Sequence, residues 1–236
     1  MSVGEVEITL LVDASIRLRY RDLNVFIDPY AADDLTAEDF AELGPADLIF
    51  LTHEDSGHFA PATITALTGE RTLVLAPLFP AWILAFLADR IRVVSLREGD
   101  HRQLRGIGVD VLPMHNIVHE QEVGGPRHRE GQGVGYLLTL GEARIYVSGD
   151  TECAPAIQAL EDVDVAFLSV NEESMWPSEA AACVAAFRPK IVVPYHIRGV
   201  DLGALTQAFA DALADATGIE LRVLDPGGTG ADASDL

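Results

Sequence analysis

Short runs of apolar, often β-branched residues recur along the whole chain, and polar or glycine-containing turns separate them. Three such runs open the sequence, at residues 6–12, 16–20 and 25–28, and this pattern predicts a meander of strands. Further along, apolar runs alternate with segments of helical character. We therefore predict sheets covered by helices, which is an α/β layer fold.

The first predicted helix covers residues 35–43. Thr36 can cap its first turn with Asp39 three residues later, and Gly44 ends it. Pro61 suits a first helical turn and begins a second short helix that ends near Gly69. The other predicted helices cover residues 80–89, 178–187 and 202–216. The other predicted strands cover residues 47–51, 72–76, 91–95, 107–114, 134–140, 144–148, 163–170, 191–195 and 220–224.

Two segments lack this periodicity. Residues 116–133 contain few regularly spaced apolar positions, and a long loop in a compact domain is usually a binding loop or lid. A tolerated surface insertion is the alternative. Residues 226–236 are polar and glycine-rich, so we predict a flexible tail after a single domain at residues 1–225.

The charge balance narrows the classes of partner. The 236 residues include 16 basic and 37 acidic ones, a formal net charge of −21, so polyanions are repelled over most of the surface. We therefore expect neither a nucleic-acid partner nor an anionic membrane. The apolar runs stay below the ~20 residues of a membrane span, and the first residues lack a signal-peptide pattern. A soluble cytoplasmic protein is the expectation.

Side chains of metal-ligand type follow several predicted strands, where ligands of α/β sheets gather. They are His53, His58, His115, Asp150 and His196. Asp55 adds an oxygen between the first two, in the pattern H-x-D-x-x-H. Any one of these residues alone is more often a cap or a solvated turn residue. Imidazole nitrogen with carboxylate oxygen is the ligand set of Zn²⁺, Fe²⁺ or Mn²⁺, so together they predict a metal site.

These residues carry a resemblance to a known family. ITLLVDASIRLRY…NVFIDPY resembles an opening hairpin with its IDP turn, and LTHEDSGHFAP stands where the family has T-H-x-H-x-D-H. VLPMHN, GYLLTLGEARIYVSGDTE and ESMWPSEAA…FRPKIVVPYH resemble the segments that carry the remaining ligands. The chain thus resembles metallo-β-lactamase-fold hydrolases, closest to the branch of ascorbate-6-phosphate lactonase. The resemblance implies a four-layer αββα sandwich with the metals at one edge, between the two sheets.

The departures from the family pattern fall in the site. Asp55 stands where the family has a histidine, and Gly57 stands where it has an aspartate that holds the second metal. Asp13 stands where the branch usually has a histidine. The Asp55 carboxylate still provides a metal ligand at its position, and its oxygen is a harder donor than the imidazole nitrogen that it replaces. Gly57 provides no ligand.

When the family's ligand positions are transferred to this sequence, the resemblance implies one or two divalent ions, Zn²⁺, Mn²⁺ or Fe²⁺. One ion takes His53, Asp55 and His115, with Asp150 as the bridge. The other takes His58, His196 and the same bridge. Harder oxygen ligation favours Mn²⁺ or Fe²⁺. Asp55 is also the predicted catalytic residue, because its carboxylate can take over the work of the missing aspartate.

The predicted function is metal-dependent hydrolysis. A metal-bound hydroxide would attack an ester, lactone, amide or phosphodiester in a small-molecule substrate, and a homo-oligomer is compatible with this function. The alternative is a degenerate member that binds metal or ligand without hydrolysis, which the absence of a carboxylate at Gly57 favours.

Other residues receive weaker predictions. His119 and His128 lie in the long loop and could reach a substrate, but exposed loop histidines are usually idle, which is the prediction here. His119 is the ligand in place of His115 if the alignment is shifted. Met175 and Trp176 are predicted to pack in the core, with a place in the wall of the pocket as the alternative. Glu172 and Glu173 are predicted to be solvated turn residues, with support of the metal ligands as the alternative. Cys153 and Cys183 receive no catalytic role, and a disulfide between them stays open.

Overall fold

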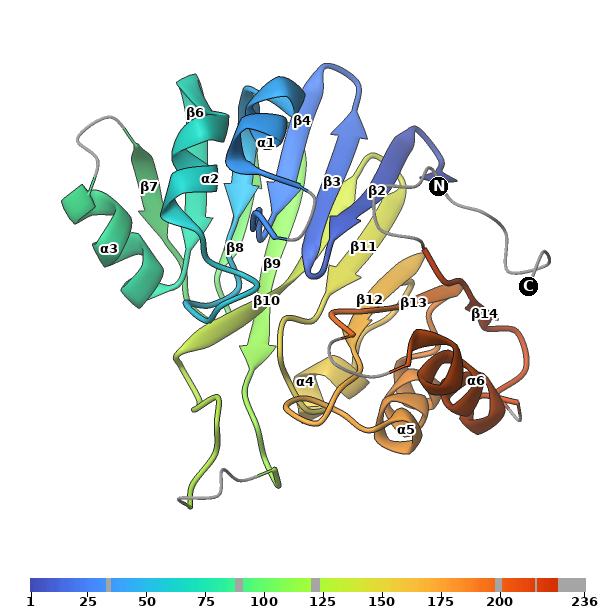
Figure 1. Ribbon diagram of the computed structural model, residues 1–236. Coiled ribbons are helices and arrows are strands. Elements are labelled where there is room, and N and C mark those ends of the chain that lie inside the picture. The colour runs from blue at the N-terminus through green and yellow to red at the C-terminus, as the bar shows by residue number, and fades with distance from the viewer. Residues whose placement is uncertain (33–34, 88–90, 120–123, 198–200, 215, 225–236) are drawn as a thin grey trace. The chain divides into compact units, whose positions relative to one another are not determined.

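The computed structural model describes the chain except for residues 33–34, 88–90, 120–123, 198–200, 215 and 225–236 (Figure 1). The predicted tail therefore lies outside the described residues, as do the ends of the predicted segment 80–89 and part of the loop 116–133. The chain divides into two compact units, Met1–Arg97 and Glu98–Val223. The prediction of a single domain at residues 1–225 stays a prediction.

The first unit is built on a seven-stranded mixed sheet whose strands follow one another in chain order. Its first four strands pair antiparallel and the last three pair parallel. The strands are β1 (Ser2–Val3), β2 (Val6–Val12), β3 (Ser15–Tyr20), β4 (Leu23–Ile27), β5 (Ala46–Phe50), β6 (Thr68–Ala76) and β7 (Arg92–Ser95). The parallel strands need crossovers, and each crossover contains a helix. The helices are α1 (Ala37–Leu43), α2 (Pro61–Leu67) and α3 (Leu78–Leu87).

Local signals position these helices. The Thr36 side chain accepts from the Asp39 backbone while the Asp39 side chain accepts from the Thr36 backbone, which confirms the predicted capping box of α1. Helix α1 ends at Gly44 and buries Phe40, whose ring centre lies 6.4 Å from that of Phe26 in β4. Figure 1 shows α1 and α2 side by side over the sheet. The unit's core lies between these helices and the sheet.

The second unit repeats this plan. Its sheet has the order β14-β13-β12-β11-β10-β9-β8, antiparallel from β8 to β11 and parallel from β11 to β14. The strands are β8 (His101–Leu104), β9 (Ile107–Met114), β10 (Gly133–Leu140), β11 (Ala143–Val147), β12 (Val165–Ser169), β13 (Ile191–Tyr195) and β14 (Glu220–Leu221). The crossovers contain α4 (Pro155–Gln158), α5 (Pro177–Phe187) and α6 (Leu202–Ala212). A disulfide joins Cys153, just before α4, to Cys183 in α5, which answers the question that the sequence left open.

Most predicted elements are present, and the fold-class prediction of α/β is confirmed with two mixed sheets. The sequence pattern missed β1, β8 and α4, which have two to four residues and are too short to show a period. Strand β6 begins at Thr68 rather than at residue 72, directly after α2. Among the described residues, no helix combines the length and the apolar character that a membrane crossing requires.

Candidate metal centre

In the first unit, the candidate donors follow β4 and β5, where the sheet changes from antiparallel to parallel pairing. Asp28 follows β4, and its fully buried carboxylate accepts hydrogen bonds from the Thr52 backbone (2.7 Å) and the Thr52 hydroxyl (2.6 Å). The Nδ1 atom of His58 lies 2.8 Å from the same carboxylate. The Nδ1 atom of His53 lies 2.9 Å from the Thr52 hydroxyl. The ring centres of His53 and His58 are 4.1 Å apart.

This network determines which nitrogen of each ring carries the proton. The Asp28 carboxylate only accepts, so His58 donates from Nδ1. The Thr52 hydroxyl donates its proton to Asp28, so His53 must donate from Nδ1 to the Thr52 oxygen. Both rings therefore present Nε2 with its lone pair, which is the state that binds a metal ion.

The turn between the two histidines is constrained by its backbone. The Asp55 carbonyl accepts from the backbone N–H groups of His58 and Phe59, both at 3.1 Å. Helix α2 has Ala60 as its N-cap and no side-chain cap, so Asp55 does not cap that helix. Gly57 has a φ of 105°, a conformation that L side chains rarely adopt. The glycine that replaces the family's aspartate is thus required by the present shape of the turn.

In the second unit, Asp150 follows β11 and His196 follows β13. The Oδ1 atom of Asp150 accepts from the Ser169 hydroxyl at 2.8 Å, and its Oδ2 atom lies 3.3 Å from Nε2 of His196. Both side chains are nearly fully buried. A buried carboxylate beside an imidazole nitrogen is a donor pair suited to a divalent metal ion.

Asn171 positions both members of this pair. Its side-chain amide donates to the Ser169 hydroxyl (3.0 Å) and to the backbone carbonyl of His196 (2.9 Å). His196 has a φ of 54°, a strained conformation for a residue other than glycine. The hydrogen bond from Asn171 holds that conformation in place. Sequence reasoning missed Ser169 and Asn171, although polar residues at the end of a fully buried strand were a usable signal.

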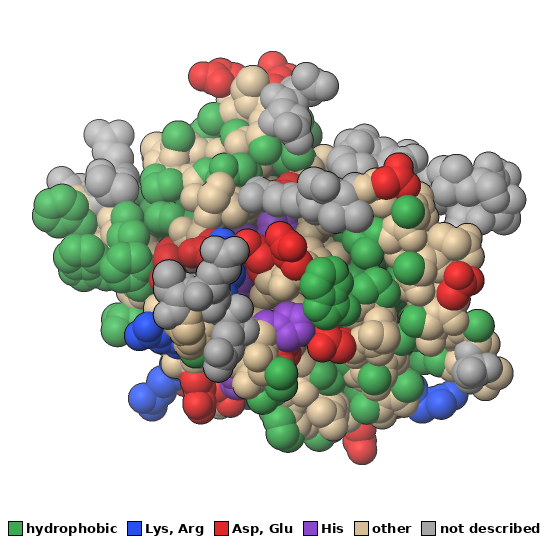
Figure 2. Space-filling model, turned by 60° about the horizontal axis from the view of Figure 1, so that its bottom comes forward, with side chains coloured by type: hydrophobic (Ala, Val, Ile, Leu, Met, Phe, Trp, Pro, Cys, Tyr) green, Lys and Arg blue, Asp and Glu red, His purple; other side chains and the backbone are tan. Residues whose placement is uncertain are grey.

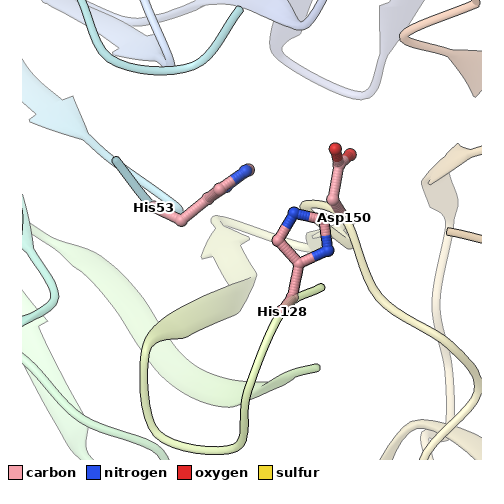
Figure 3. Close-up of side chains that lie close together, drawn as sticks. All are labelled: His53, His128 and Asp150. Carbon is pink, nitrogen blue, oxygen red and sulfur yellow. The ribbon is translucent and has the colours of Figure 1, made fainter. Parts of the chain in front are cut away.

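His128 is a candidate donor that sequence reasoning set aside. The prediction of an exposed loop residue is wrong, because only 4% of His128 is exposed. A ligand atom of His128 lies within 4.8 Å of a ligand atom of Asp150, and Figure 3 shows these two side chains of the second unit. His128 therefore joins the candidate donors.

Asn116 orients the His128 ring. The Asn116 amide nitrogen donates to the Glu173 carbonyl at 3.0 Å, so the amide oxygen faces His128. That oxygen accepts from the His128 backbone (2.8 Å) and from Nδ1 of the ring (3.1 Å). Nδ1 therefore carries the proton, and Nε2 keeps its lone pair for a metal ion.

Two predicted ligands, Asp55 and His115, are not tested by these distances. Among the described residues, neither Asp55 nor His115 belongs to a group of three or more potential donors whose ligand atoms lie within 4.8 Å of one another. His115 is half-buried, and its backbone N–H donates to the Thr151 hydroxyl at 3.1 Å. Asp13 lies in the turn after β2 with a φ of 53°. The ligand roles of Asp55 and His115 stay predictions.

A groove of about 400 Å³ lies in the second unit, and one of its lining residues is Glu152, two positions after Asp150 in the chain. Ile117, Val118 and Met175 line it with apolar side chains, and Glu152 and Glu179 line it with carboxylates. Met175 is buried as predicted. The prediction for its neighbour Trp176 is wrong, since that side chain is 49% exposed.

His119 lies beside these carboxylates. Its Nε2 atom is 3.1 Å from the Glu179 carboxylate. Partial burial lowers the pKa of His119, but the hydrogen bond and charge of Glu179, with the charge of Glu152, outweigh it. The pKa of His119 is therefore raised above its ordinary value, and the imidazolium form is favoured at neutral pH more than in a free histidine.

The residues present fit a divalent metal ion on the chemistry of their donor set. Hydrogen bonds at Nδ1 leave Nε2 as the ligand atom of His53, His58 and His128. The Asp150 carboxylate is buried beside His196. Neutral imidazoles with fixed tautomers and a buried carboxylate are characteristic of metal sites with supporting hydrogen bonds.

Comparisons with known proteins agree with this interpretation. A curated relative from Pelotomaculum thermopropionicum, named UPF0173 metal-dependent hydrolase, is 26% identical over 210 residues, covering 86% of this chain and 90% of the relative. A crystal structure from Parabacteroides distasonis, described as a candidate metal-dependent hydrolase, is 30% identical, with a TM-score of 0.80 and coverage of 93% and 94% of the two chains.

A more distant neighbour shares the fold alone. CmlA from Streptomyces venezuelae, a diiron β-hydroxylase, is 17% identical, with a TM-score of 0.72 over 94% of this chain and 53% of that chain. The model of the beta-lactamase superfamily domain matches residues 7–196, which include both sets of candidate donors. The predicted family is thereby confirmed: the chain belongs to the beta-lactamase superfamily.

Proposed function

We propose that this metal-dependent hydrolase of the beta-lactamase superfamily cleaves an uncharged ester, lactone or amide bond in a small molecule. The observation that carries the proposal is the buried Asp150 carboxylate, with His196 at 3.3 Å and a His128 ligand atom within 4.8 Å. When bound, a divalent metal lowers the pKa of a coordinated water to ~7 and polarises the bond that is attacked.

The proposal assigns a metal to Asp150, His128 and His196 of the second unit. His53 and His58, in the first unit, keep the metal-ligand role that the sequence predicts for them. The support is that the family match includes all five and that hydrogen bonds prepare three of the rings as ligands. Imidazole with carboxylate suits Zn²⁺, Mn²⁺ or Fe²⁺, and the proposal is open to one ion or two.

The protein's own groups hold the donors in place. Asp28 and Asn116 keep protons on the Nδ1 atoms of His58 and His128. Ser169 donates to Oδ1 of Asp150 and so fixes the orientation of that carboxylate. Asp55 is the proposed orienting group for the attacking water, because it lies in the turn between His53 and His58.

The groove that Glu152 helps to line supports the choice of an uncharged substrate. Its apolar side chains, Ile117, Val118 and Met175, suit an acyl or ring portion. Glu152 and Glu179 repel a phosphate, and the net charge of −21 disfavours anions more generally. A phosphodiester is therefore the less favoured of the predicted substrate classes.

The test combines metal analysis with a substrate panel. Purified protein is loaded with Zn²⁺, Mn²⁺ or Fe²⁺, its metal content is measured, and hydrolysis of lactones, esters, amides and phosphodiesters is followed. Asp150→Asn should lose most bound metal and activity. Asp110→Asn is the matched control, because Asp110 also pairs with a histidine, His101 at 2.6 Å, but at an exposed position.

Three outcomes would overturn parts of the proposal. Metal binding without cleavage of any substrate would favour the degenerate binding protein. Preference for phosphodiesters would contradict the role given to the acidic groove. Unchanged metal content in Asp150→Asn would contradict the metal assignment itself.

A further inference from the structure

Helix α3 presents an apolar stripe to solvent. Four large side chains form this stripe: Leu78 (73% exposed), Phe79 (50%), Trp82 (62%) and Phe86 (81%). Figure 2 shows hydrophobic side chains gathered at the left edge of the view, over the position of α3 in Figure 1. The three rings stack along the helix, with centroid separations of 6.2 Å from Phe79 to Trp82 and 6.3 Å from Trp82 to Phe86.

The stripe is not needed for the core of its own unit. The opposite face of α3 buries Ala81 and Leu84, which belong to the core cluster with residues such as Ile49 and Val74. A solvent-facing helix surface normally carries charged or polar residues, but Leu78–Leu87 contains none. A contiguous apolar patch of this kind usually marks an interaction site.

The area of the stripe suits a partner with the same shape. Aromatic side chains expose 150–250 Å² each when free, so the four side chains present about 500 Å² at their observed exposures. Two such stripes packed together bury about 1,000 Å² in total, which reaches the lower limit of specific interfaces.

We propose that the stripe on α3 is a homodimer interface, in which α3 packs against α3 of a second copy across a two-fold axis. In such an arrangement the same patch serves both chains, and an uninterrupted apolar stripe is complementary to itself. Aromatic residues are enriched in the cores of interfaces, and charged residues are depleted there. The stripe has both properties.

The charge pattern around the stripe favours a second copy of the chain over an anionic membrane as its partner. Helices that bind anionic membranes carry Lys and Arg beside their apolar face, whereas α3 has neither and the chain carries a net charge of −21. Two copies repel each other over the rest of their surfaces. Because salt screens that repulsion, the dimer should tighten as ionic strength rises.

The two tryptophans of the chain make the test direct. Trp176→Phe leaves Trp82 as the sole tryptophan. With rising protein concentration, we expect sedimentation equilibrium to show a dimer, and Trp82 emission to shift to shorter wavelength with weaker quenching by acrylamide. Raising NaCl from 50 mM to 1 M should lower the dimer dissociation constant at least tenfold.

Substitutions test the surface itself. Phe86→Glu, and Trp82→Glu in the otherwise natural chain, should weaken the dimer at least 100-fold, because each places a charge in the stripe. Trp176→Glu is the matched control at the other exposed tryptophan and should leave the dimer intact. Both stripe positions are exposed, so circular dichroism and the melting temperature should stay close to those of the natural chain.

Several results would contradict the proposal. One is a chain that stays monomeric at every concentration and salt level. Another is a dimer that survives Phe86→Glu and Trp82→Glu, and a third is a dimer that weakens as the salt concentration rises. A monomer whose Trp82 emission shifts only with neutral phosphatidylcholine vesicles would identify a lipid surface as the occupant instead.

Discussion

The Nδ1 atom of His58 lies 2.8 Å from the Oδ2 atom of Asp28, thirty positions earlier in the chain, and both side chains are fully buried. Asp28 also accepts from the backbone and hydroxyl of Thr52, which in turn contacts His53. One carboxylate thus determines the proton positions on two candidate ligands. Such supporting groups usually contribute strongly to metal affinity.

Asp28→Asn should therefore weaken metal binding roughly 10- to 100-fold, because the amide no longer selects the Nδ1-protonated ring of His58. Metal affinity is measured by titration against a chelator of known strength. Asp110→Asn, which alters an exposed Asp–His pair in the second unit, should leave the affinity unchanged. Equal effects of the two substitutions would show that Asp28 has no special relation to the metal.

His128→Ala should reduce metal affinity by at least as much as Asp28→Asn does, because it removes a proposed ligand rather than a supporting group. Asn116→Ala should have a smaller effect of the same sign, since it frees the ring that Asn116 orients. His119→Ala is the control, because His119 contacts Glu179 instead. Metal content unaffected by His128→Ala would remove His128 from the site.

Restoring the family's aspartate should destabilise the protein. Gly57→Asp forces an L side chain onto a φ of 105°, with an expected loss of about 1–3 kcal/mol in the free energy of unfolding. Gly57→Ala should lose a similar amount, because the backbone and not the carboxylate is the cause. Gly203→Ala, at the start of α6 and in ordinary van der Waals surroundings, should be nearly neutral.

The family pattern also leads to the expectation that the double variant Asp55→His with Gly57→Asp has a higher occupancy of a second metal. The Gly57 variants test whether the turn tolerates that change. Stable Gly57 variants with higher metal content would show that the turn rearranges easily. Destabilised variants without added metal would show that the turn itself has diverged.

The pair of His119 and Glu179 should stabilise the fold more at low pH. The pKa of His119 is raised, so this contribution is fully present below the unfolded pKa near 6.5 and is lost as pH rises through the folded pKa. Urea unfolding of the natural chain and of Glu179→Gln should differ by about 0.5 kcal/mol at pH 5.5 and by little at pH 9. Glutamine can keep the capping bond to the Trp176 backbone, so the charge alone is tested.

In a His119→Gln background, Glu179→Gln should show no such pH dependence. The charged groups that influence this ring are Glu179 and Glu152, and the Glu172 backbone also hydrogen-bonds to it. A difference that stays constant from pH 5.5 to pH 9 would mean that another group titrates.

The disulfide bears on the location of the protein. Cys153 and Cys183 are bonded, and such bonds are uncommon in the cytosol outside some hyperthermophiles. The cytoplasmic location therefore stays a prediction, and the redox state of this pair in purified protein is a direct observation that bears on it.

The sequence alone determined the elements whose signals are local. Alternating apolar runs marked the long strands, Thr36 and Asp39 marked the start of α1, and the order of histidine and aspartate motifs identified the family. The strand and helix signals depend on residues within a few positions of one another, and the family signal depends only on the order of short motifs along the chain. Periodicity needs several residues, which is why β1, β8 and α4 escaped it.

The tertiary structure decided which side chains meet. His128 and Asn116 are twelve residues apart, and the loop between them carries no periodicity, so only folding shows that His128 is buried and oriented. The same holds for Asn171, which holds His196 from twenty-five residues away. Contacts of this kind depend on chain reversal and burial, which a one-dimensional pattern of residue types does not contain.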